Sequence, residues 1–103
     1  MLDLLAREPE LAGCYVAGGG SEGAIAALRE LAPEEPPVLV CNEDTPVTRR
    51  ALTDGVVALA IVTPLEKLGR ELVTLMGDAL SEPSSAIGQH TILQFNLLLP
   101  ESF

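Results

Sequence analysis

The strongest constraint on the fold is the alternation of short apolar runs with longer amphipathic segments. Three runs, residues 14–17, Val38–Cys41 and residues 58–62, are too short for helices and are bounded mainly by Gly, Pro, Asn or Thr. Between them, apolar residues recur every three to four positions, as on one face of a helix. Strands that alternate with helices are typical of parallel βαβ units. The sequence therefore predicts an α/β fold with a parallel sheet.

The first two helices are predicted from their start signals. Ser21 follows three glycines and is expected to cap a helix, where Glu22 suits the positive N-terminal end. Thr45 followed by Pro46 is a strong signal, because the hydroxyl accepts from an orphan amide and proline at the first position needs no donor. The second helix is expected to end near an Asp-Gly pair at residues 54–55.

The longest helix is predicted after the third apolar run. Thr63 precedes Pro64 and stands three positions before Glu66, which is the spacing of a capping box. The helical pattern continues to Leu80 and is expected to stop at Pro83.

Two strands are expected to differ in burial. Val38–Cys41 is a continuous apolar run, which predicts a strand buried on both faces. The tail at residues 91–99 carries Gln94 and Asn96 two positions apart, as expected of a strand with one less buried face.

Composition limits the partners of the chain. A length of 103 residues with 48% hydrophobic content fits one compact domain. Fifteen acidic against six basic residues give a net charge of -9, which repels a phosphate backbone. We therefore expect no nucleic-acid binding by this chain itself.

The thiols and the start of the chain bear on its location. Cys14 and Cys41 lie in apolar runs, as reduced core thiols do. The first residues lack the basic and apolar regions of a signal peptide, and no apolar run reaches the roughly 18 residues of a membrane span. The sequence predicts a cytoplasmic protein that does not enter the membrane.

Candidate ligand-binding residues follow the predicted strands. In an open parallel sheet, ligands collect at the carboxyl ends of the strands, beside free helix amides. Gly18 and Gly19 allow close backbone approach, Glu43 or Asp44 can accept hydrogen bonds from hydroxyl groups, and Asn42 can donate or accept them. Asp44 also suits a cap of the helix that starts at Pro46. Thr63 adds a hydroxyl, although it also suits a helix cap, and the glycines also suit a simple turn. Glu43 has no evident structural role, so the sequence favours it as the main residue of a polyol site.

Catalytic, metal and cofactor sites are not indicated. No Lys follows the glycines at residues 18–20, and their spacing matches neither the P-loop nor the dinucleotide motif. His90 is the only histidine and has no partner at dyad or ligand spacing, while no serine stands in a nucleophile elbow. Glu34 and Glu35 beside prolines are typical of a solvated charge run rather than a metal site. We predict a protein that is not an enzyme and that uses no cofactor.

Three stretches together resemble the type I periplasmic-binding fold, found in the sensing domains of lactose-repressor (LacI) regulators and in sugar-binding proteins of transporters. Residues 15–28 resemble the family's strand that ends in a ligand-facing turn and enters a helix. Residues 38–46 look like its next strand, whose terminal acidic residue usually holds sugar hydroxyls. Residues 48–61 are similar to the helix that ends in Asp-Gly before the last ligand-contacting strand.

The resemblance assigns ligand roles to individual residues. It implies that Glu43 takes the place of the acidic ligand residue and Thr63 that of a polar ligand residue, usually glutamine. The family commonly has an Asn-Asp pair near Ala17 and Gly18, where this chain has only small residues. The departure implies a roomier site or a ligand other than a simple sugar.

The resemblance also implies a function and a place in a larger protein. Residues 1–103 are expected to be the C-terminal portion of a two-lobe sensing domain in a LacI-family transcriptional regulator that senses a sugar or other small polar metabolite. DNA would be bound only through an absent N-terminal domain. A homodimer is expected, because a missing half leaves apolar faces uncovered. The alternatives are a solute-binding protein of a sugar ABC transporter and, less favoured, a nucleotide-binding α/β module.

Overall fold

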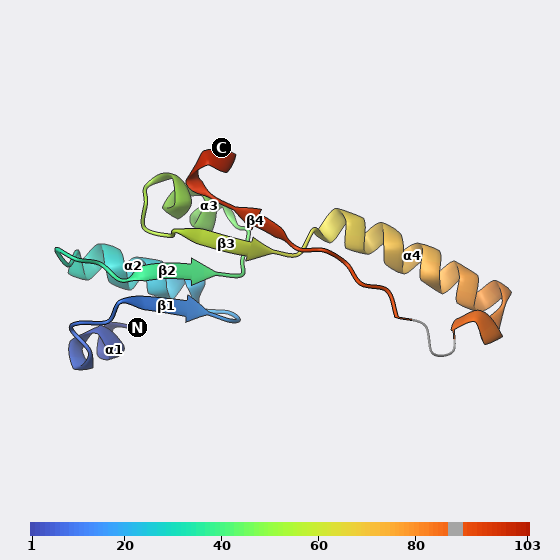
Figure 1. The fold of residues 1–103 in the computed structure, drawn as a ribbon, viewed down its shortest axis with the longest axis horizontal. Coiled ribbons are helices and arrows are strands. Elements are labelled where there is room, and N and C mark those ends of the chain that lie inside the picture. The colour runs from blue at the N-terminus through green and yellow to red at the C-terminus, as the bar shows by residue number, and fades with distance from the viewer. Residues whose placement is uncertain (87–89) are drawn as a thin grey trace. The chain divides into compact units, whose positions relative to one another are not determined.

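The computed structural model describes residues 1–86 and 90–103, and the chain divides into two compact units (Figure 1). Unit 1 comprises Met1–Val62 together with Leu97–Phe103, and unit 2 comprises Thr63–Asn96. Residues 87–89, directly before His90, lie outside the described residues. His90 itself is exposed and outside regular structure.

Helices and strands alternate along the chain around a four-stranded sheet. The elements up to the third strand, with the returning fourth strand, are α1 (Leu2–Arg7), β1 (Gly13–Val16), α2 (Ser21–Leu31), β2 (Val38–Cys41), α3 (Pro46–Thr53), β3 (Leu59–Val62) and β4 (Asn96–Leu98). The strand order is β1-β2-β3-β4, and β2 is parallel to both β1 and β3. Figure 1 shows these three strands side by side. The predicted α/β fold is confirmed, with β1, β2 and β3 parallel.

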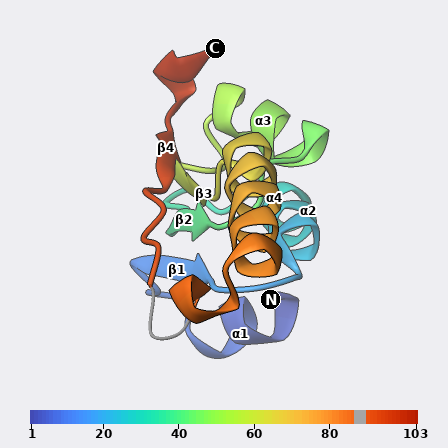
Figure 2. The same ribbon diagram turned by 90° about the vertical axis from the view of Figure 1, so that its right-hand side faces the viewer.

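The core of unit 1 lies on one face of the sheet. Leu39 and Cys41 of β2 are buried, and they belong to one cluster with Ile25 and Leu28 of α2 and Leu52 of α3. Figure 2 shows α2 and α3 on the same side of the strands. Burial of this apolar face is the main driving force for the packing of unit 1.

The prediction that β2 is buried on both faces is wrong. Val38 is 56% exposed and Val40 is half-buried, whereas the alternating residues Leu39 and Cys41 are buried. Within unit 1 the helices cover only the face that carries Leu39. Successive side chains of a strand point to opposite faces, so an apolar run can still have one open face.

The predicted start of α3 is confirmed, whereas the start of α2 differs. Thr45 is the N-cap of α3 and is followed by proline, as expected. At α2 the N-cap is Gly20, with a φ of 106°, and no side chain caps the helix. Ser21 is the first helical residue and is fully buried, and its Oγ has no hydrogen-bond partner in residues 1–86 and 90–103. The prediction of a Ser21 cap is therefore wrong, because the helix begins one residue earlier.

Replacement of Gly20 by alanine is expected to lower the free energy of unfolding by about 1–2 kcal/mol, because a side chain is strained at this positive φ. Gly18→Ala is the matched control in the same loop, since Gly18 has no positive φ and an added Cβ meets no atom within 4 Å. Urea denaturation of both variants measures the difference. Equal losses would show that backbone strain at Gly20 is not the cause.

Unit 2 contains the longest helix, α4 (Leu65–Ser81), followed by a short 3-10 helix at Pro83–Ala86. The predicted end of the helix before Pro83 is confirmed. The predicted capping box is wrong, because Pro64 occupies the N-cap and no side chain caps the helix. Since the helix begins at Leu65, the Thr63 hydroxyl precedes the N-cap position.

The C-terminal tail forms less strand than the sequence predicts. Of residues 91–99, only Asn96–Leu98 are β-structure, and Ile92 and Phe95 are exposed. Within the described ranges, the structure contains no helix with the length and hydropathy that a membrane crossing requires.

Candidate functional site

The exits of β1 and β2 are neighbours at one edge of the sheet. The parallel register places Val16 opposite Cys41, and each is the last residue of its strand. The chain therefore leaves the sheet at adjacent points, through residues 17–20 and 42–45, and enters α2 and α3. This is the carboxyl edge at which the sequence predicts a ligand site.

The Asn42 side chain joins the two exits. Its Nδ2 donates to the carbonyl oxygen of Ala17 at 3.1 Å, and its Oδ1 accepts from the Tyr15 hydroxyl at 2.9 Å. The structure thus ties Ala17, the residue before Gly18, to the β2 exit. Both ends of the amide are engaged, which the sequence alone did not indicate.

Gly18 and Gly19 form an open part of the site. Both residues are exposed, and a Cβ built on either would meet no atom within 4 Å. A ligand can therefore approach their backbone without displacing a side chain.

At the β2 exit, Glu43 carries a carboxylate without a partner among the described residues. Its residue is half-buried, and its carboxylate makes no hydrogen bond or ion pair with any residue that the structure describes. Its backbone is held, because the buried Thr48 donates from Oγ1 to the Glu43 carbonyl oxygen at 2.9 Å. The carboxylate is therefore attached to a fixed backbone position and is available to a ligand.

Thr48 holds this loop from inside α3. Its Oγ1 also accepts from the Thr45 amide at 2.8 Å, while Thr45 Oγ1 accepts from the Thr48 amide at 3.1 Å. This reciprocal capping box satisfies two amides at the helix start. Thr45 is the predicted cap, whereas the role of Thr48 was not predicted from the sequence. Its signal is a second hydroxyl residue three positions after the cap.

Asp44, next to Glu43, is occupied by an ion pair. Arg49 donates from Nε and from a terminal nitrogen to the two carboxylate oxygens, at 2.6 and 2.9 Å. The hydrogen bond from Arg49 holds the pKa of Asp44 below its usual range. Arg49 also lies over the Phe103 ring, 5.3 Å from its centre. Asp44 is thus charged and paired, so Glu43 is the acidic residue left for a ligand.

The other residues singled out from the sequence have varied surroundings. Thr63 is exposed, directly follows β3 and is the first residue of unit 2. Cys14 is half-buried, Cys41 is buried, and both thiols are free. Across residues 1–86 and 90–103, no three His, Cys, Asp or Glu side chains gather so that they could hold a metal ion.

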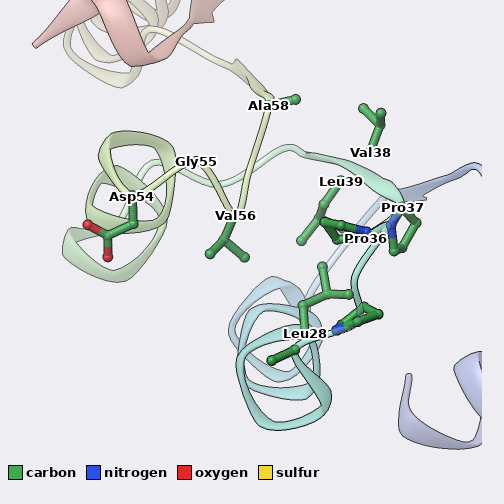
Figure 3. A pocket seen from close by; sticks show the side chains of 11 residues that line it. Leu28, Pro36, Pro37, Val38, Leu39, Asp54, Gly55, Val56 and Ala58 are labelled. Carbon is green, nitrogen blue, oxygen red and sulfur yellow. The ribbon is translucent and has the colours of Figure 1, made fainter.

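An apolar pocket lies at the amino edge of the sheet, opposite the strand exits (Figure 3). It encloses about 290 Å³ between the ends of α2 and α3 and is lined by residues such as Leu28 and Val38. Its acidic residue, Asp54, is paired with Arg29 at 3.0 Å, and Figure 3 shows the carboxylate pointing away from Leu28. Among its lining residues, Asp54 has the only polar side chain and is already paired, so the exits are the better candidate site.

Comparison with known proteins identifies the fold. No protein-family model matches the sequence, and no curated protein is significantly similar to it. Among solved structures, the chain is similar to GanP, a glucose-galactose binding protein from Geobacillus stearothermophilus, with 16% identity and a TM-score of 0.79 over 96% of this chain and 35% of that chain. It is also similar to a mutant XylFII–LytSN complex, with 17% identity and a TM-score of 0.74 over 95% of this chain and 38% of that chain.

The chain spans about a third of the length of these two structures. At such low identity, the likeness concerns the arrangement of the backbone. The chain therefore has the α/β fold of one part of a type I periplasmic-binding protein.

Proposed function

We propose that this chain is part of a domain that binds a sugar or another small polar metabolite at the exits of β1 and β2. The observation that carries the proposal is the Glu43 carboxylate, which is half-buried and unpartnered within the described structure, on a loop held by Thr48. A charged acceptor forms strong hydrogen bonds with ligand hydroxyls. The backbone likeness to a glucose-galactose binding protein supports the same class of ligand.

The remaining candidate residues have complementary roles in this proposal. Gly18 and Gly19 present open backbone. Asn42 has a second amide hydrogen and a second lone pair on Oδ1, so it can contact a hydroxyl group while keeping both of its observed hydrogen bonds. The site binds a ligand without chemical conversion.

The larger protein that we favour is a cytoplasmic LacI-family regulator. The free thiols of Cys14 and Cys41 suit a reducing compartment. The net charge of -9 disfavours contact of this chain with DNA, so that contact would fall to a separate N-terminal domain. Ligand binding would then shift an equilibrium between two states of the regulator. The open sheet face at Tyr15 and Val38 offers an apolar surface for a homodimer.

A solute-binding protein of a sugar transporter is the second candidate. The observation that favours it is the likeness to GanP, which is itself a sugar-binding protein. Both candidates use the same ligand site, so they share the test of that site.

An NMR titration of the isotope-labelled chain tests the proposed site. We expect D-glucose, D-galactose or D-xylose to cause saturable shift changes at the amides of Gly18, Gly19 and Glu43. Gly55, at the opposite edge of the sheet, serves as the internal control and should not respond. The absence of saturable changes with all three sugars, or changes confined to the Gly55 edge, would contradict the proposal.

A further inference from the structure

We infer that Tyr15 and Asn42 are positioning residues, which set the place of the glycine loop (residues 18–20) relative to Glu43. The inference rests on the proposed function and adds a determinant of affinity that need not touch the ligand. It starts from the two hydrogen bonds that run from the Tyr15 hydroxyl through the Asn42 amide to the Ala17 carbonyl. We call this arrangement the Asn42 clamp.

The orientation of the Asn42 amide follows from the chemistry of its partners. A carbonyl oxygen can only accept, so the nitrogen of the amide must face Ala17. The amide oxygen then faces Tyr15, whose hydroxyl must donate. Rotation of the amide by 180° would break the hydrogen bond to Ala17 and reverse the direction of the one to Tyr15, so the observed orientation is the one that keeps both partners bound in this way.

The Asn42 clamp lies just past the end of the pairing between β1 and β2, where it can hold the glycine loop in place. The register pairs Tyr15 with Val40, so Tyr15 and Asn42 are diagonal neighbours on the open face of adjacent strands. The paired part of the two strands ends at Val16 and Cys41. The Asn42 side chain thus continues the connection between the strands by one residue after the backbone pairing stops.

The glycine loop has little else to hold it. A Cβ built on Gly18 or Gly19 would meet no atom within 4 Å, and within the described chain neither residue makes a backbone hydrogen bond to another segment. The next anchor is the Ala24 amide, which donates to the Gly20 carbonyl oxygen at 3.0 Å inside the first turn of α2. The clamp at Ala17 is therefore the tether on the strand side of the loop.

Tyr15→Phe in the full chain removes one hydroxyl of this clamp. Tyr15 is 55% exposed, so the substitution should leave the melting temperature nearly unchanged. We expect the NMR order parameters of Gly18 and Gly19 to fall from about 0.8 to below about 0.6. Asn42→Ala should have the same effect, and the double variant should show no further change. Thr53→Val is the matched control, because it deletes an exposed hydroxyl that bonds only within α3.

The same variants are titrated with D-glucose, D-galactose and D-xylose. If the wild-type chain binds one of these sugars, Tyr15→Phe should weaken binding by about threefold to tenfold, and the double variant should lose no more affinity than Asn42→Ala alone. If the order parameters of Gly18 and Gly19 are unchanged in Tyr15→Phe, the positioning role of the clamp is rejected, whether or not a sugar binds. Additive losses of affinity in the double variant would also overturn it, because they would show that Tyr15 and Asn42 act independently. A mobile loop with unaltered affinity would overturn it as well. If the variants lose loop order but the wild-type chain binds none of the three sugars, the clamp is supported and the proposed function is rejected.

Discussion

Replacement of Leu39 by alanine should lower the free energy of unfolding by about 2–5 kcal/mol, the largest change in stability that we expect for a single substitution. Leu39 is 1% exposed and lies on the central strand β2, between β1 and β3. Its side chain belongs to the cluster that includes Ile25 of α2 and Leu52 of α3. Removal of its terminal carbons leaves a cavity that the surrounding strands and helices can close only in part.

Val38→Ala is the matched control on the same strand. Val38 is the preceding residue, faces the open side of the sheet and is 56% exposed, so its truncation should cost less than about 1 kcal/mol. Urea denaturation followed by circular dichroism measures both variants. If Leu39→Ala abolishes folding, Leu39→Val provides a milder step of about 1 kcal/mol. A loss for Val38→Ala as large as that for Leu39→Ala would contradict a core on one face only.

Replacement of Glu43 by glutamine should weaken sugar binding by about 1.5–3 kcal/mol, which is about tenfold to 150-fold in the dissociation constant. Glutamine keeps the size of the side chain but removes the charge that strengthens hydrogen bonds to ligand hydroxyls. The carboxylate has no partner among the described residues, so the unfolding free energy should change by less than about 0.5 kcal/mol. Calorimetric titration with the sugar that the chain binds measures the affinity.

Asp44→Asn is the charge-matched control for this experiment. It removes the same charge one residue further along, but Asp44 is engaged by Arg49 and not available to a ligand. Loss of an exposed ion pair changes the stability of the fold little, and Asp44 makes no proposed ligand contact. The affinity should therefore stay within about twofold of the wild type. Unaltered affinity of Glu43→Gln together with a lower melting temperature would make Glu43 a structural residue.

The order of the elements could be predicted from the sequence because its signals are local. Val38–Cys41 is a strand with the predicted bounds, and α3 begins at Thr45 and Pro46 as expected. Helix α3 also ends where predicted, with Asp54 as its C-cap and Gly55 next to it at a φ of 83°. Each signal depends on a few neighbouring residues and on backbone sterics, so a short stretch of sequence suffices to locate it.

Elements whose stability comes from packing were predicted less well. The short helix α1 (Leu2–Arg7) was missed, since it has no side-chain cap and its formation depends on contacts of Met1 and Leu5 with the core. The expected caps at Ser21 and Thr63 were wrong, because the conformation of the preceding backbone decides where a helix begins. A capping residue in the sequence shows that a cap is possible, not that it forms.

The sequence by itself determined which polar residues follow the strands, and so it located the candidate site at residues 42–44. Only the tertiary structure decided how these three residues differ. Asn42 is bound by Tyr15 and Ala17 from another strand, and Asp44 is bound by Arg49, which leaves Glu43 free among the described residues. A carboxylate or an amide has the same hydrogen-bonding capacity wherever it stands in the chain, but the partners that satisfy it are brought close by the fold. The burial of β2 also depends on the fold, because α2 and α3 pack on one side of the sheet only and so bury one face of the strand.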